Sequence, residues 1–168
     1  FKTIADNSIN AKPTFGIVLT MDDCYYEDFI NATQILEKHN LPCTFFVPTK
    51  YSVNNTPLWP LKIVKILESP ELVYKNEHAQ ELTFKGMEDK ITLKSNIINE
   101  LVWDEEQTNL IEEKVEKISQ LNGYVATQAD KVIDEHIIKM YAENPLFSFQ
   151  SHTFSHPKLY LQTEKELA

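Results

Sequence analysis

Two short groups of polar residues in this sequence have side chains that could carry out chemistry. Asp22 and Asp23 are adjacent, and His152 and His156 are separated by three residues. Buried carboxylates need a cation or another partner, so one aspartate could bind a metal ion while the other transfers a proton. Histidines four residues apart on a helical turn present both rings on the same face, within reach of one metal ion.

Each group also has a simpler interpretation. The aspartates could form an acidic pair in a solvated turn, and the histidines could be ordinary surface or core residues. The combination is more informative, because two histidines and a carboxylate form a facial triad that leaves coordination positions open for water and substrate. A closed structural zinc site would need a further Cys or His ligand, for which Cys24 is the nearby candidate.

Both groups directly follow segments that we predict to be strands. Residues 15–20 form an apolar run that is typical of a strand buried on both faces of a parallel sheet. The spacing of apolar residues predicts a helix over 27–39, and residues 43–47 are a second predicted strand. A strand, a helix and a strand within about 33 residues indicate a βαβ unit with parallel strands. A third short strand is predicted at 146–149.

The carboxyl ends of such strands are where α/β proteins bind ligands, and both polar groups are expected there. The segment between the second and third strands is polar and mainly helical. We interpret residues 57–128 as an insertion within a single domain that spans 1–168. Between the second and third strands, we predict a helix at 60–68, an irregular or hairpin region at 70–94, a helix from the Asp104–Gln107 capping box to Asn122, and a helix at 129–143.

Length and composition exclude several classes of protein. The chain has 168 residues, of which 42% are hydrophobic, and a formal net charge of −9. These values argue against a disordered chain and against a nucleic-acid partner, which would require a basic surface. No glycine-rich phosphate-binding motif occurs, and no apolar stretch reaches the length of about 18 residues that spans a membrane. Cys24 and Cys43 are too few for a disulfide framework, so we expect buried free thiols.

Three strings of residues occur in the order that is found in one enzyme family. Residues 19–24 read LTMDDC, which is similar to a strand motif ending in T-F-D-D-G. Residues 35–47 read ILEKHNLPCTFFV, which is similar to a helix followed by P-A-T-F-F-V. Residues 152–157 read HTFSHP, which fits H-[ST]-x-x-H-P. Over residues 14–50 and 145–167 the chain resembles the polysaccharide deacetylase family, also called the NodB-homology domain or carbohydrate esterase family 4.

The resemblance implies a fold, a reaction and a site. The fold would be α/β, a partial or distorted (β/α) barrel similar to a TIM barrel, with a mainly helical insertion. Asp22 would be the general base, and Asp23, His152 and His156 would bind a divalent metal ion, with Zn²⁺ expected. The reaction would be hydrolytic removal of N-acetyl groups from an amino sugar in a polysaccharide or glycoconjugate. The resemblance points to no particular substrate-binding residues.

Two departures from the family pattern keep alternatives open. Cys24 stands where the motif has glycine, and its side chain could crowd the substrate, bind the metal ion or have no effect. The family's later motifs, including a Leu-x-x-His that bears the general acid, have no counterpart, so we expect a domain that is incomplete at its C-terminal end. The alternative function is a catalytically impaired, truncated relative that binds a carbohydrate or a protein. A third is a metal-dependent amidohydrolase acting on a small molecule.

Two further properties follow less directly. A partial barrel with an exposed sheet edge would favour a homo-oligomer. No signal peptide is recognisable at the start of the chain, but a chain that begins at Phe1 suggests a longer product, so the sequence leaves the compartment open.

Overall fold

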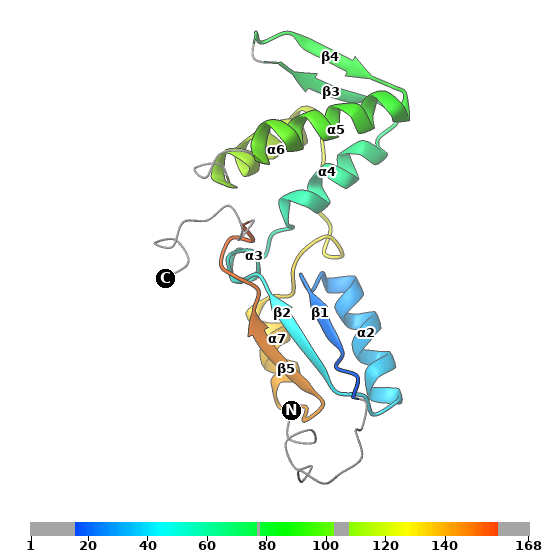
Figure 1. The fold of residues 1–168 in the computed structure, drawn as a ribbon, viewed down its shortest axis with the longest axis vertical. Coiled ribbons are helices and arrows are strands. Elements are labelled where there is room, and N and C mark those ends of the chain that lie inside the picture. The colour runs from blue at the N-terminus through cyan, green and yellow to red at the C-terminus, as the bar shows by residue number, and fades with distance from the viewer. Residues whose placement is uncertain (1–15, 77, 103–107, 158–168) are drawn as a thin grey trace.

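The computed structural model describes residues 16–76, 78–102 and 108–157, which form an elongated molecule with a unit at each end (Figure 1). The sheet unit contains β1 (Thr20–Asp22), α2 (Tyr26–Lys38), β2 (Cys43–Val47), α7 (Glu135–Ala142) and β5 (Phe147–Ser151). The other unit, which we call the α4–α6 module, contains α4 (Trp59–Glu68), β3 (Leu72–Lys75), β4 (Glu81–Phe84), α5 (Met87–Val102) and α6 (Thr108–Leu121). The short helix α3 (Thr49–Asn54) lies between the two units.

The three-stranded sheet is parallel throughout, in the order β1-β2-β5. Asp22 of β1 pairs with Phe46 of β2, and Val47 of β2 pairs with Ser151 of β5. The predicted βαβ unit is therefore confirmed, with α2 as its crossover helix. Because the strands are parallel and in register, the carboxyl ends of all three reach the same edge. The mixed α/β class is confirmed, whereas the described strands form an open sheet and the predicted barrel is not confirmed.

Helix α2 forms because its sequence supplies one stripe of side chains for the sheet. Phe29, Thr33 and Leu36 recur at helical spacing and are buried. Acidic residues in the first turn and Lys38 in the last turn complement the helix dipole. Just past the helix, Asn40 adopts a left-handed φ of +52°, which helps to end it.

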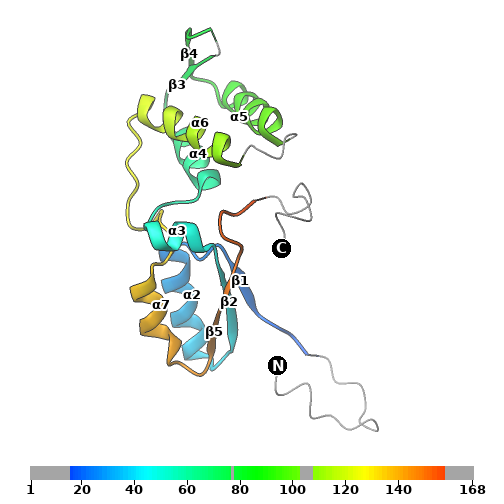
Figure 2. The same cartoon turned by 90° about the vertical axis from the view of Figure 1, so that its left-hand side faces the viewer.

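The core of the sheet unit is an aromatic cluster between the sheet and its two helices. The ring of Phe29 in α2 lies 4.8 Å from that of Phe45 in β2 and 5.1 Å from that of Tyr141 in α7, both edge to face. Alternation along β2 turns Phe45 toward this core and leaves Thr44 and Phe46 on the other side of the sheet. Helices α2 and α7 lie together on the core side (Figure 2), and no described helix covers the second side, which we call the open face.

The α4–α6 module has a hydrophobic core of its own. Ile66 of α4, Leu72 of β3 and Val115 of α6 are among its buried side chains. The β3–β4 turn is fixed by Asn76, whose Oδ1 accepts two backbone N–H groups within the turn. None of the helices in the described ranges is both long and apolar enough to cross a membrane.

The first strand is shorter and more exposed than its sequence predicts. Of the run predicted over 15–20, β1 takes only the last residue and extends to Asp22. Ile17 and Val18, at 89% and 52% exposed, precede the paired residues, because the positions opposite them, Leu41 and Pro42, lie before β2 begins at Cys43. The prediction of a strand buried on both faces is therefore wrong.

Other elements differ at their boundaries or were not expected. The helix predicted at 129–143 begins only at Glu135, because the Asp134 carboxylate caps it by accepting the N–H of Ile137. The hairpin expected within 70–94 is present, but the last residues of that range belong to α5. Helix α3 is not predicted from the sequence. The Asp104–Gln107 capping box lies outside the described residues.

Replacing the central core ring tests this packing. Phe29→Ala should lower the free energy of unfolding by about 3–5 kcal/mol, because it removes a fully buried ring that contacts three other aromatic rings. Val125→Ala is the control, since Val125 is 81% exposed and its truncation should change that free energy by less than about 0.5 kcal/mol. Urea unfolding followed by circular dichroism measures both. Equal losses in the two variants would contradict the assigned core.

Candidate metal centre

Three of the side chains that the sequence singles out converge at the carboxyl edge of the sheet. Asp23 directly follows β1 and His152 directly follows β5, so parallel pairing brings both to one edge, on either side of β2. His156 lies farther along the segment that follows β5, residues 152–157, which we call the histidine loop.

The geometry of the three side chains is compact. His156 Nε2 lies 3.1 Å and His152 Nε2 lies 3.6 Å from Asp23 Oδ1. The centroids of the two imidazole rings are 5.0 Å apart. One ligand atom from each of the three residues lies within 4.8 Å of the others. Among the described residues, this is the one group of three or more acidic, histidine or cysteine side chains that is close enough to share a metal ion.

The Asp23 carboxylate has an unmet requirement that a cation would satisfy. Its Oδ1 atom is buried and accepts no hydrogen bond, even though His156 Nε2 is near. A buried carboxylate oxygen without a donor is unfavourable, and such groups in folded proteins are paired or coordinate a metal ion. One carboxylate and two imidazoles are the donor set of a facial site for Zn²⁺ or another divalent transition metal. The residues present therefore fit a divalent metal ion.

In the metal-free protein, the contact between Asp23 and His156 favours an ionised carboxylate and a protonated imidazole. Contact with the His156 imidazole lowers the pKa of Asp23, against the opposing effect of burial. The same contact raises the pKa of His156 above 6.5, with a smaller contribution from the negative charge of Asp22. A divalent ion would compete with the proton of His156, because a coordinating imidazole must be neutral.

The histidines are not presented by a helical turn, contrary to the prediction from their spacing. Within the histidine loop, Thr153 and His156 have left-handed φ values of +63° and +55°. A hydrogen bond from the His156 N–H to Thr153 Oγ1, 3.1 Å long, closes the loop. Across the site, Asp23 and Cys24 are also left-handed, with φ of +63° and +49°. Each such residue costs on the order of 1–3 kcal/mol, and such strain gathers at functional sites.

Helix α3, which the sequence does not reveal, anchors the histidine loop. The backbone N–H groups of Thr49 and Lys50 donate to the carbonyls of Thr153 and Phe154, at 3.2 and 2.9 Å. The first N–H groups of a helix have no partner inside the helix, so the loop satisfies two of them. The His152 N–H donates to the carbonyl at the end of β2, at 2.8 Å, and fixes the start of the loop.

Asp22, the predicted general base, lies beside the three-residue cluster without joining it. It is the last residue of β1, and its side chain is exposed on the open face of the sheet. That face is polar near the middle strand, where Thr44 Oγ1 and Ser148 Oγ form a hydrogen bond of 2.8 Å. Asp22 and Asp23 thus have different surroundings, as expected for adjacent residues at a strand end.

Cys24 is a buried thiol rather than a fourth ligand. Its side chain is fully buried, and its Sγ donates to the carbonyls of Phe46 and Met21 at 3.5 and 3.6 Å. Burial, together with the nearby carboxylates of Asp23 and Asp22, raises its pKa to about 12, so it stays protonated. Of the three roles left open for Cys24, metal binding is therefore not supported by the geometry.

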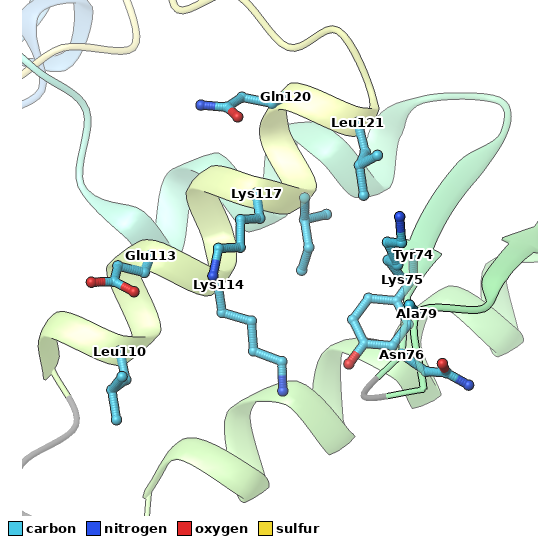
Figure 3. A pocket seen from close by; sticks show the side chains of 11 residues that line it. Tyr74, Lys75, Asn76, Ala79, Leu110, Glu113, Lys114, Lys117, Gln120 and Leu121 are labelled. Atoms are coloured by element: carbon cyan, nitrogen blue, oxygen red, sulfur yellow. The ribbon is translucent and has the colours of Figure 1, made fainter.

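A groove lies elsewhere in the molecule. A groove of about 940 Å³ in the α4–α6 module runs between α6 and the β3–β4 hairpin. Figure 3 shows side chains of α6, including Lys114 and Lys117, on one side and Tyr74 and Lys75 of β3 on the other. None of the four predicted site residues lines it, so the chemistry-bearing group is not in this groove.

Comparison with known proteins identifies the family. A family model described as polysaccharide deacetylase matches residues 10–168, nearly the whole chain. The chain therefore belongs to the polysaccharide deacetylase family, whose domain is also called the NodB-homology domain, and the resemblance of the three sequence strings is confirmed. The family consists of carbohydrate-deacetylating hydrolases that generally depend on a divalent metal ion. No curated protein and no solved structure matches the chain.

The contact between Asp23 and His156 predicts a measurable titration. In chelator-treated protein, NMR titration should place the pKa of His156 above 6.5, and Asp23→Asn should lower it more than Asp22→Asn does. The protonated imidazole then stabilises the folded chain fully below about pH 6.5, and this contribution disappears as the pH rises through the raised pKa. An unchanged pKa in Asp23→Asn would contradict the contact.

The two cysteines should be unreactive in the folded protein. Both are free and buried, and burial raises the pKa of each thiol. At pH 8 a disulfide reagent such as Ellman's reagent should therefore modify neither Cys24 nor Cys43 quickly, and both should react once urea unfolds the chain. Rapid reaction of one thiol in the native protein would show that a cysteine lies in an accessible, polar site.

Proposed function

We propose that this chain is a metal-dependent hydrolase that removes N-acetyl groups from an amino sugar in a polysaccharide or glycoconjugate. The observation that carries the proposal is the buried Oδ1 of Asp23, which lies 3.1 and 3.6 Å from the Nε2 atoms of two imidazoles at the carboxyl edge of a parallel sheet. Membership of the polysaccharide deacetylase family supplies the class of substrate.

Asp23, His152 and His156 would hold the metal ion. Zn²⁺ suits one carboxylate and two imidazoles, and an ion bound here supplies Lewis acidity that acidifies water and polarises a carbonyl. Three protein ligands leave positions open for water and substrate. The anchoring of the histidine loop by α3 and β2 would hold the two imidazoles in a fixed orientation before substrate arrives.

Asp22 would act as the general base. Its exposed carboxylate, next to Asp23 in sequence, would accept a proton from the attacking water as the water oxygen bonds to the acetyl carbon. When the C–N bond then breaks, the nitrogen of the amino sugar takes up the proton that left the water, and acetate is released. Asp22 is suited to this role because, unlike Asp23, it lies on the open face, where a substrate could reach it.

The open face would receive the substrate. Next to Asp22 it presents Phe46, together with the Thr44–Ser148 hydroxyl pair and the exposed side chain of Gln150. Hydroxyl and amide groups are hydrogen-bonding partners for sugar hydroxyls, and an aromatic ring packs against the apolar face of a sugar. This composition favours a carbohydrate over an apolar ligand.

Separate substitutions of the two aspartates should distinguish their roles. Asp22→Asn should lower the rate of acetate release from N-acetylglucosamine oligomers by about 10²- to 10⁴-fold while Zn²⁺ still binds. Asp23→Asn should abolish Zn²⁺ binding and activity together. Acetate release and Zn²⁺ content, measured on the same preparations before and after chelator treatment, test both.

The matched control is Asp28→Asn, which makes the same change at an exposed position of α2 and should leave both readouts unchanged. A wild-type chain that holds no divalent ion would overturn the proposed site. A chain that binds Zn²⁺ and acetylated oligomers without releasing acetate would instead support the binding-module alternative.

A further inference from the structure

The carboxylate of Glu112 links the α4–α6 module to α3, the helix that anchors the histidine loop. Glu112 of α6 accepts a hydrogen bond from the Tyr51 hydroxyl at its Oε1 and forms an ion pair of 2.5 Å with Lys50 Nζ at its Oε2. Lys50 and Tyr51 are consecutive residues of α3, so both oxygens of Glu112 are used on the same turn of that helix.

These contacts are shielded from solvent. Tyr51 is 4% exposed, and the side chains of Lys50 and Glu112 are 22% and 24% exposed. Partly buried, charge-assisted hydrogen bonds are stronger than those on an open surface, where water and salt screen them. The Glu112 carboxylate therefore restrains the position of α3 against the module.

The same turn of α3 holds the histidine loop. Lys50 uses its side chain for Glu112 and its backbone N–H for the Phe154 carbonyl, 2.9 Å away. The Tyr51 hydroxyl oxygen also lies 3.4 Å from the carbonyl oxygen of Ser155, the residue before His156. Two residues of α3 thus contact Glu112 on one side and the histidine loop on the other.

We propose that Glu112 is a positioning residue for the metal centre, acting through Lys50 and Tyr51 on the loop that carries His152 and His156. This inference rests on the proposed function for its metal ion and adds to it the role of the α4–α6 module. The module contributes no ligand of its own to the described cluster. It sets the affinity of the site by fixing the loop that supplies two of the three ligands.

Neighbouring charges of α6 provide a matched comparison. One turn along, Glu116 forms an ion pair of 2.8 Å with Lys62 of α4, so this pair lies entirely within the module. Glu112 and Glu116 therefore share a helix, a residue type and a lysine partner. They differ in the helix that supplies the lysine. The partner of Glu112 belongs to α3, which contacts the histidine loop, whereas the partner of Glu116 belongs to α4.

The test compares Glu112→Gln with Glu116→Gln in the full chain. Each substitution removes one charge and keeps the shape of the side chain, so neither opens a cavity. Glu112→Gln should bind Zn²⁺ about 3- to 10-fold more weakly in a competition titration with a chelator, whereas Glu116→Gln should stay within about 2-fold of the wild type. Hydrogen exchange of the Thr49 and Lys50 amides in the metal-free chain should be faster in Glu112→Gln alone.

The outcomes separate this inference from the proposed function. If the wild type binds no Zn²⁺, the proposed metal site fails, and equal amide exchange in the two variants would overturn the positioning role as well. If the wild type binds Zn²⁺ and both variants match it, Glu112 has no positioning role. Should Glu112→Gln fail to fold, Tyr51→Phe removes one contact to the same carboxylate. This variant should also bind Zn²⁺ more weakly than the wild type, by a smaller factor. An unchanged affinity would count against the proposal.

Discussion

The parallel pairing of three strands is the constraint on which the rest of this structure depends. Asp23 and the histidine loop are separated by most of the chain, and they meet because β1, β2 and β5 run in the same direction and stop in register. Antiparallel pairing of β5 would place His152 at the opposite edge, more than a strand length from Asp23. The aromatic cluster around Phe29 serves this arrangement, because it fixes α2 and α7 on one side of the sheet and leaves the other side without a described helix.

The polar edge of the sheet carries features that packing alone does not favour. A carboxylate oxygen is buried against two imidazoles, and non-glycine residues on both sides of the site adopt left-handed backbone angles. Such features persist only where surrounding structure holds them. Here the support comes from the N–H groups of α3, from the end of β2 and from the hydrogen bond within the histidine loop.

Much of the fold and of the candidate site could be predicted from the sequence. The βαβ unit follows from apolar runs of the right lengths around a helical stripe, and the candidate metal ligands follow from residue types at the ends of predicted strands. The convergence of Asp23, His152 and His156 was predictable because strand ends of a parallel sheet share an edge. Local patterns do not reveal α3, whose six residues show no distinct periodicity, or the partners of Glu112, which lie about 60 positions away. Nor does an HxxxH spacing distinguish a helical turn from a left-handed loop.

The separation of the candidate ligands along the chain has a thermodynamic consequence. Asp23 and His152 are roughly 130 positions apart, so an ion shared between them closes a loop that contains nearly every other described element. The unfolded chain could not bring three such distant side chains onto one ion without a large loss of entropy, so an ion at the candidate site would bind the native state selectively. By mass action, the melting temperature would rise with the concentration of free ion. The centre would then act as a reversible cross-link, linking the supply of metal in the surroundings to the lifetime of the folded protein.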